Sequence, residues 1–359
     1  MKINKNHFAV KNILWLMLVA LFGFSSWIQA KDTVIKLATS SPINKITLTS
    51  IEGAGLSSEH TAAVVFKRIV ERRTEKAIKV NIYPNSQLGD EPELWQSLQQ
   101  GIIQMSTASC SPLANFVPEW MAFSIPYLIE SPEILYEVLQ GQLGRKFQKL
   151  VIDKIGVRIL AWSFLGFRHF TNDSKVIRSP ADLKGMKIRV IQTPDMVKLV
   201  EGFGAQAVPI NWSELYSALQ QGVVDGEENP FSMIQQAKLY EVQKYITTDG
   251  HRLGVLPISI NEKFYKSLSL ENRKIVKDTA MRAAAVFRAQ LYLGNTLWIE
   301  DFQKKGVKIY SPEPQEMEQF RSIAHLKVIP YIRDKIGNEW VDAVLKAVKL
   351  AEKEYFREK

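Results

Sequence analysis

Two segments of the chain, 121 residues apart, resemble each other, and this internal similarity limits the possible folds more than any other feature. Residues 93–103 (ELWQSLQQGII) and 214–224 (ELYSALQQGVV) are identical at six of eleven positions. In each copy, apolar residues at helical spacing lead to a glycine that ends the helix, and a short apolar strand follows. Chance or common helix chemistry is the alternative explanation. A true repeat predicts two lobes with similar α/β plans and a cleft between them, where ligands commonly bind.

The elements around the first copy alternate between strand and helix. Ser57 or Ser58 can cap a helix, and residues 78–82 alternate between apolar and polar as in a half-buried strand. The predicted order is a strand at 34–38, a loop at 39–58, a helix, a strand at 78–82, a helix ending at Gly101 and a strand at 102–108. Such a β-α-β-α-β order predicts a largely parallel sheet covered by helices.

A second series of elements follows and ends in a long helix. Its predicted strands are 157–162, 187–190, 242–247 and 255–260, and its predicted helices are 195–203 and 213–221. Residues 270–304 contain no proline and one glycine, Gly294. They predict an unusually long helix that bends or bridges two lobes.

The first thirty residues have the features of a secretory signal peptide. Lys2, Lys5 and Lys11 are followed by an apolar run at 13–24, and then by small and polar residues up to Ala30. We predict cleavage near Ala30 and export of the mature chain. An uncleaved anchor is the alternative, but twelve apolar residues are too few to span a bilayer.

Charge and cysteine content exclude several classes of function. The net charge is +9, or +6 without the three lysines of the predicted signal (9 − 3 = 6), and basic residues are mixed with acidic ones. Nucleic-acid binding is disfavoured because no basic run is interleaved with aromatic residues. Cys110 is the only cysteine, so neither an intrachain disulfide nor a cysteine-based zinc site can form, and we expect a small buried residue there.

Motif searches predict neither an enzyme nor a metal or cofactor site. The chain lacks the Gly-x-Ser-x-Gly elbow, the phosphate-binding P-loop and His-Glu-x-x-His. Residues 202–207 fit the loose dinucleotide fingerprint, but a helix precedes them where a strand is required. The acids Asp225, Glu227 and Glu228 could ligate a cation, although acidic residues are common in a turn after a strand.

Three residues are candidates for holding a carboxylate. Arg189 lies in a strand between Ile188 and Val190, so strand alternation directs it to the opposite face; a surface charge is the alternative. Arg168 follows a strand among aromatic residues, and its planar guanidinium matches a carboxylate. Asn229 precedes Pro230, which interrupts strand pairing and leaves the amide free for a ligand. For the last two, packing and a plain turn are the alternatives.

The sequence resembles the periplasmic solute-binding subunits of tripartite ATP-independent periplasmic (TRAP) transporters, the DctP type. Its most specific blocks are 83–90 (YPNSQLGD), 182–190 (DLKGMKIRV) and 218–230 (ALQQGVVDGEENP), in the family's order. The resemblance implies a two-lobed α/β fold of the type II periplasmic-binding-protein kind, with a ligand cleft and a long lobe-spanning helix. The implied lobes are 31–160 plus about 255–290, and 161–254 plus about 291–359. The loop at 39–58 is longer than in the family.

The resemblance also assigns roles to residues. Arg189 would form the main salt bridge to a substrate carboxylate, with Asn229 on the other side of that group and Arg168 as a second arginine. Trp212 would form an aromatic wall, and Glu93 and His251 are further carry-overs from the family.

The resemblance further implies a function: a periplasmic protein that captures a small organic carboxylate, such as a C4-dicarboxylate, keto acid or sugar acid, and delivers it to TRAP permease subunits in the membrane. A binding protein for an ATP-driven importer or a sensory receptor is one alternative, and an exported hydrolase is another.

Overall fold

The computed structural model of the chain describes residues 33–42 and 58–357. The predicted signal peptide and residues 43–57 of the predicted loop lie outside this part of the chain. Within the described residues, no helix combines the length and the apolar character needed to cross a membrane.

The strands of the described residues join in one nine-stranded sheet with the order β2-β1-β3-β8-β4-β7-β5-β6, and β9 pairs with β8 beside this path. The strands are β1 (Thr33–Ala38), β2 (Ile78–Tyr83), β3 (Met105–Ser106), β4 (Val157–Asn172), β5 (Lys187–Val190), β6 (Gln206–Pro209), β7 (Gly226–Pro230), β8 (Tyr245–Asn261) and β9 (Lys308–Tyr310). β1 pairs parallel with β3, and β5 pairs parallel with β6 and β7. β4 and β8 pair antiparallel with each other and with β7 and β3. The predicted parallel pairing therefore holds on either side of β4 and β8, whereas these two strands pair antiparallel with each other, with β7 and with β3; the short β9 adds a parallel pair to β8.

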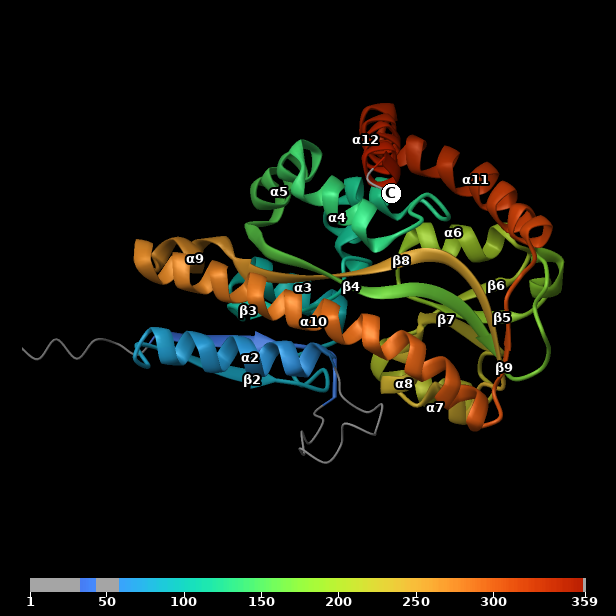
Figure 1. Ribbon diagram of the computed structural model, residues 1–359, viewed down its shortest axis with the longest axis horizontal. Helices are drawn as coiled ribbons and strands as arrows, with labels where there is room; N and C mark the ends of the chain where they lie inside the picture. The colour runs from blue at the N-terminus through green and yellow to red at the C-terminus, as the bar shows by residue number, and fades with distance from the viewer. Residues whose placement is uncertain (1–32, 43–57, 358–359) are drawn as a thin grey trace, which may run out of the picture. The chain divides into compact units, whose positions relative to one another are not determined.

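β4 and β8 are much longer than the strands predicted from the sequence and run across the sheet (Figure 1). Their pairing extends from Val157 opposite Asn261 to Asn172 opposite Tyr245, with three register shifts on the way. These irregularities interrupt the period-two pattern, and both faces of the strands are largely buried. For this reason the prediction for 157–162 was too short, since β4 continues to residue 172. The two predicted strands 242–247 and 255–260 belong to the single strand β8.

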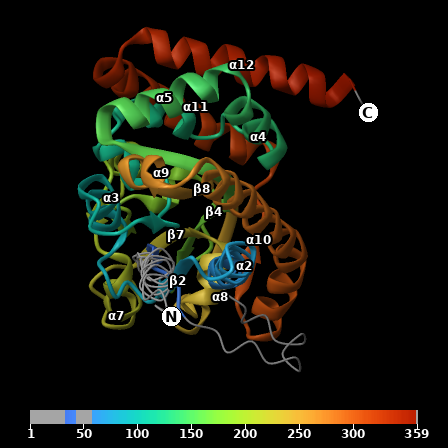
Figure 2. The same cartoon turned by 90° about the vertical axis from the view of Figure 1, so that its left-hand side faces the viewer.

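Helices cover both faces of the sheet (Figures 1 and 2). They are α2 (Ser58–Arg73), α3 (Glu91–Gln100), α4 (Pro132–Gln140), α5 (Gln142–Ile155), α6 (Pro194–Gly202), α7 (Leu215–Gln220), α8 (Phe231–Gln236), α9 (Glu262–Ser267), α10 (Leu270–Lys304), α11 (Pro314–Ile336) and α12 (Asn338–Arg357). One buried hydrophobic cluster packs α2, α8 and α10 on the sheet. The other cluster packs α3, α4, α5, α6, α11 and α12 on the sheet.

The predicted long helix is confirmed as α10, which has the predicted bounds. Its N-cap, Ser269, accepts a hydrogen bond from the backbone N–H of Asn272. Gly294 allows a close approach, because a Cβ there would lie 2.4 Å from the Trp298 side chain. α10 packs along α2, β4 and α8 and also contacts β9.

The two copies of the internal repeat adopt the same local structure. Gly101 (φ 75°) and Gly222 (φ 68°) both take the left-handed conformation after a helix. The next residue in each copy, Ile102 or Val223, donates its N–H to the carbonyl five residues earlier. β3 then pairs with β1, and β7 with β5, both parallel. The repeat is therefore a true similarity of plan, although the predicted strand at 102–108 shortens to β3.

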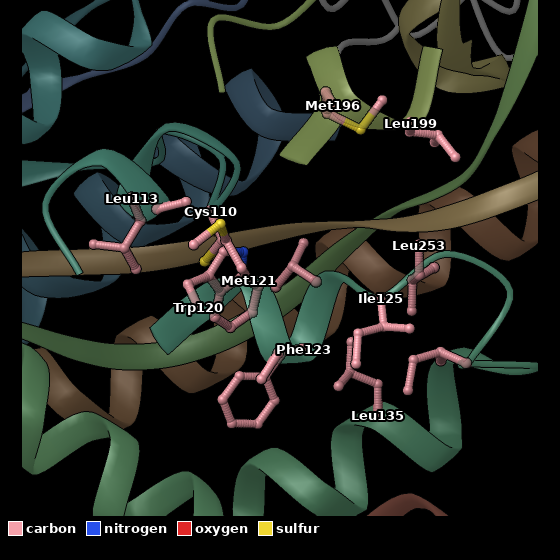
Figure 3. Packing of buried hydrophobic residues seen from close by; sticks show 14 of the residues in the cluster. Cys110, Leu113, Trp120, Met121, Phe123, Ile125, Leu135, Met196, Leu199 and Leu253 are labelled. Atoms are coloured by element: carbon pink, nitrogen blue, oxygen red, sulfur yellow. The ribbon is translucent and has the colours of Figure 1, made fainter. Parts of the chain in front are cut away.

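A dense aromatic core lies beside the sheet (Figure 3). The Trp120 ring stacks on Phe123 and Trp162 at centroid distances of 5.3 and 6.1 Å. Cys110 belongs to this cluster with 1% of its surface exposed, which confirms the expected small buried residue. The core fixes the segments before α4 against β4.

The lobe boundaries predicted from the sequence stay a prediction. From Val34 onward the chain divides into no further compact units, because β4 and β8 run through the whole sheet. α12 packs against α4 and α5. The predicted boundaries place α12 in one lobe and α4 and α5 in the other.

Candidate functional site

A small cavity lies where β4, β5 and β7 approach the segments that follow β1 and β3. Its lining residues are Ser40, Glu91, Ser109, Leu165, Arg168, Arg189, Ile191, Trp212, Asn229 and Met233. Its volume is about 20 Å³, room for about one water molecule. A larger ligand can therefore enter only if the two sides separate.

Arg189 is buried at this cavity, not exposed on the outer surface. β5 places Ile188 and Val190 in the core and leaves Arg189 only 2% exposed on the other side of the strand. Its Nε and Nη2 donate to the carbonyl of Ile210 at 2.9 and 2.8 Å, which fixes the guanidinium. The third nitrogen, Nη1, is buried and has no hydrogen-bond partner within the described residues. A buried charged donor without an acceptor is costly, so Nη1 is the natural contact for an anion.

Arg168 also lines the cavity, but the protein already neutralises it. Its Nε and Nη2 donate to the Glu228 carboxylate, and Nη2 also donates to Asn229 Oδ1 at 3.1 Å. Burial alone would lower the pKa of Arg168, but Glu228 outweighs burial and raises it. Arg189 lacks such a bidentate acid, and burial lowers its pKa. Of the two arginines, Arg189 is thus the one with unsatisfied charge.

The side-chain amide of Asn229 bridges Arg168 of β4 and Glu227 of β7. Its Oδ1 accepts from Arg168, and its Nδ2 donates to the Glu227 carboxylate. Burial, reinforced by the neighbouring Glu228 charge, raises the pKa of Glu227 to about 7. One N–H of Nδ2 remains beyond this contact, so the amide can still meet a ligand.

His251 does not line this cavity. It is fully buried in β8, with Nδ1 2.8 Å from Asp249 Oδ2 and Nε2 3.1 Å from Glu228 Oε2. Burial opposes the imidazolium, but the two carboxylates prevail and raise the pKa of His251 to about 9. The charged ring therefore holds Glu228, which in turn holds Arg168. Its contact with the site is indirect.

Trp212 and Glu91 face the cavity from equivalent positions of the repeat. Trp212 begins the short 3₁₀ turn Trp212–Glu214 before α7, and Glu91 begins α3, 121 residues earlier. Glu93, which the resemblance suggested, is exposed on α3 and lies outside the cavity. Glu93 lies two residues beyond Glu91 in the first turn of α3, and a ligand role for Glu93 stays a prediction.

Glu91 adds an acidic group to the cavity lining that it shares with the two arginines, whose charges favour its ionised form. Its carboxylate accepts hydrogen bonds from the N–H and the hydroxyl of Ser109, at 2.8 and 2.6 Å. Burial raises the pKa of Glu91, and these two hydrogen bonds oppose the rise. The cavity lining thus combines two cations with a hydrogen-bond acceptor.

Two hydrogen bonds beside the cavity join the region around the first copy of the repeat to the region around the second copy. Ser213 Oγ donates to Asp90 Oδ2 at 2.6 Å, and Asn115 Nδ2 donates to the Gln192 carbonyl at 2.9 Å. Asp90 is the N-cap residue of α3, directly before Glu91. The two sides are therefore in contact, which agrees with the small volume between them.

The bacterial extracellular solute-binding proteins of family 7, called DctP, match residues 50–330. The chain belongs to this family. A solute-binding protein of Verminephrobacter eiseniae is 33% identical over 260 residues, which cover 72% of this chain and 77% of that one. The DctP family is a family of solute-binding proteins and not a family of enzymes.

Solved structures of DctP-type proteins have the same two-lobed fold. The sugar acid binding protein DctPAm from Advenella mimigardefordensis, in complex with galactonate, has a TM-score of 0.82 at 29% identity and covers 89% of this chain and 99% of its own. A TRAP periplasmic solute binding protein from Sulfurospirillum deleyianum, with bound succinate, has a TM-score of 0.78 at 27% identity, with coverages of 87% and 98%.

The described residues contain no group of three or more His, Cys, Asp or Glu side chains arranged to hold a metal ion. Of the six residues named from the sequence, Arg189, Arg168, Asn229 and Trp212 meet at the cavity. His251 and Glu93 do not.

Proposed function

We propose that this DctP protein captures a small hydroxylated monocarboxylate, of the sugar-acid class, and delivers it to a TRAP permease. The single observation that carries the proposal is the unsatisfied Nη1 of the buried, fixed Arg189 guanidinium. An incoming carboxylate supplies the missing acceptor and forms a charge-assisted hydrogen bond.

The acidic part of the cavity lining favours hydroxyl groups over a second carboxylate. Glu91 and Ser109 come from α3 and the segment after β3, so hydroxyls of a ligand that Arg189 of β5 holds could donate to the Glu91 oxygens. A second carboxylate there would meet a like charge unless Glu91 took up a proton. A relative with bound galactonate supports this preference, and the succinate-bound relative shows that the family also includes binders of dicarboxylates.

Closure of the two sides would couple binding to transport. In an open form, a carboxylate reaches Arg189, and the sides then approach until contacts such as Ser213 to Asp90 form. Closure excludes water and strengthens the ion pair. Ligand drives closure only because the closed form binds it more tightly.

The site of action proposed for the chain is the periplasm, with TRAP permease subunits as the membrane partner and export directed by a signal peptide cleaved near Ala30. The family and the TRAP-type structural relatives support this. A partner of the ATP-driven or receptor type remains the alternative, and a neighbouring gene for a large multi-span membrane protein without an ATPase would favour the permease.

Calorimetric titration of the purified protein with galactonate, succinate and the uncharged polyol galactitol tests the proposal. We expect galactonate to bind, succinate to bind more weakly, and galactitol not to bind. Equal binding of galactitol, or no binding of any carboxylate, would overturn the assignment of Arg189 as the anchor.

A further inference from the structure

A second and larger cavity, of about 450 Å³, lies in another part of the molecule. It shares no lining residue with the arginine cavity. β4 contributes to both: Arg168 lines the first, and its neighbours Phe167 and His169 line the second. Strand alternation explains this division, because consecutive side chains point to opposite sides. The volume is in the range of small-molecule sites.

The walls of the second cavity are apolar and largely aromatic. Phe167, Ile129, Phe231 and Met317 supply them, from β4, the segment before α4, α8 and α11. The His169 ring packs against Phe231 with a centroid distance of 4.6 Å. Such walls suit a flat apolar body and do not suit a polyol, so this is not a second sugar-acid site.

His169 is a largely buried residue whose ring lines this cavity. The turn residue Gly250 (φ 58°) donates its N–H to His169 Nδ1 at 3.1 Å, which leaves the ring hydrogen on Nε2. His169 is 8% exposed, and burial lowers its pKa to about 4, so the ring is neutral. Within the described residues Nε2–H has no hydrogen-bond acceptor.

Two further polar groups converge on the same space. Arg321 Nε is buried and lacks a hydrogen-bond partner, and the half-buried Asn295 amide makes no hydrogen bond to any described residue. Arg321 makes two long ion pairs with exposed carboxylates, at 3.9 Å to Glu130 and at 4.0 Å to Glu318. Two of the three groups can only donate, so a ligand must bring acceptors to them.

The one buried acid at this cavity does not oppose an anion strongly. Asp249 accepts hydrogen bonds from Tyr127 Oη at 2.9 Å and from the Phe170 N–H at 3.2 Å, and it contacts the charged His251 at 2.8 Å. Its charge is therefore compensated within the protein.

From these contacts we infer that the second cavity binds a small aromatic carboxylate, with its ring between Phe167 and Phe231 and its carboxylate on the donors His169, Asn295 and Arg321. The inference does not depend on the identity of the cleft ligand. It gives the protein two binding sites for different chemical classes of acid.

Fluorine NMR with 4-fluorobenzoate as the probe tests the site. We expect the 4-fluorobenzoate signal to broaden and shift at millimolar concentrations, and that of the uncharged 4-fluorobenzyl alcohol to change much less. Met317→Trp, which fills the cavity from α11, should weaken probe binding about tenfold or more. Asn295→Leu, which removes one polar partner, should weaken it by a smaller factor.

Matched measurements separate the two sites. Arg189→Ala should leave 4-fluorobenzoate binding unchanged, and Met317→Trp should keep galactonate binding, which also shows that the variant folds. Probe binding that is lost in Arg189→Ala and kept in Met317→Trp would place the probe in the arginine cavity and overturn the inference. No binding to the wild type, or equal binding of the alcohol, would also overturn it.

Discussion

Replacing Arg189 by alanine is the most direct test of how the cleft works. Arg189 is 2% exposed, and a carboxylate bound to Nη1 would be screened little by water. Two unit charges about 4 Å apart at an effective dielectric constant of about 20 attract by about 4 kcal/mol. Removing one partner of a buried charge pair costs roughly 2–5 kcal/mol. The dissociation constant of a sugar acid should therefore rise roughly 30-fold to several-thousand-fold.

Arg189→Lys should recover only part of the loss. The guanidinium uses Nε and Nη2 to bind the Ile210 carbonyl and offers Nη1 in a fixed direction. An ammonium group is a point charge on a flexible stem and cannot reproduce this fork. We expect an affinity between those of the wild type and Arg189→Ala.

The assay is calorimetric titration with galactonate, supported by thermal melting to show that each variant is folded. Arg68→Ala, at an exposed position of α2, is the matched control for loss of one positive charge. An Arg189→Ala protein that is folded and binds galactonate as tightly as Arg68→Ala would refute the assigned role.

Three other outcomes can be measured on the same protein. Glu91→Gln keeps the side-chain shape and removes the acidic wall, so titrations should show succinate affinity rising about tenfold relative to galactonate; an unchanged ratio would argue against the wall. The pKa of His251 is about 9 in the folded state against 6.5 when unfolded, so its stabilisation is complete below pH 6.5 and is lost as pH rises through 9. Melting temperatures should thus fall from pH 7 to 9.5, and less steeply in His251→Gln; parallel slopes would contradict this. Trp120→Ala should lower the free energy of unfolding by about 3–5 kcal/mol in denaturant titrations, because it empties a fully packed aromatic cluster, and a loss under about 1 kcal/mol would count against that packing.

Local patterns predicted the fold well where one element could be read by itself. The bounds of α10 follow from an absence of proline and a capping serine, both visible in the sequence. β4 and β8 were underestimated because register shifts and burial on both faces remove the period-two signal. For residues 314–357 no element was predicted, and α11 even contains Pro330 inside the helix. That helix depends on packing against α6 and α12, which no local pattern reveals.

The site was predictable to the extent that strand position determines direction. The alternation around Arg189 and the position of Arg168 after a strand led to two residues of the cavity, and the family resemblance added Trp212. Asn229 also lines the cavity, but the expected strand break was wrong, because β7 continues to Pro230, which pairs with Arg168, and the Asn229 amide is engaged by Arg168 and Glu227. What a single position cannot show is which partner it already has. Both arginines are carboxylate-binding candidates in the sequence. Only the folded chain shows that Glu228 binds Arg168, whereas Nη1 of Arg189 has no partner within the described residues.

The repeat also explains why the cleft would orient its ligand. Glu91 and Trp212 each lie two residues before their copy of the repeat, and each is the first residue of a helical segment that begins at the cavity. Both side chains therefore line the cavity, and their chemistry differs completely. An acidic acceptor on one side and an indole face on the other cannot be satisfied by a symmetric ligand. Together with the fixed Nη1 of Arg189, they favour a molecule with a carboxylate at one end, hydroxyls facing Glu91 and an apolar edge against Trp212.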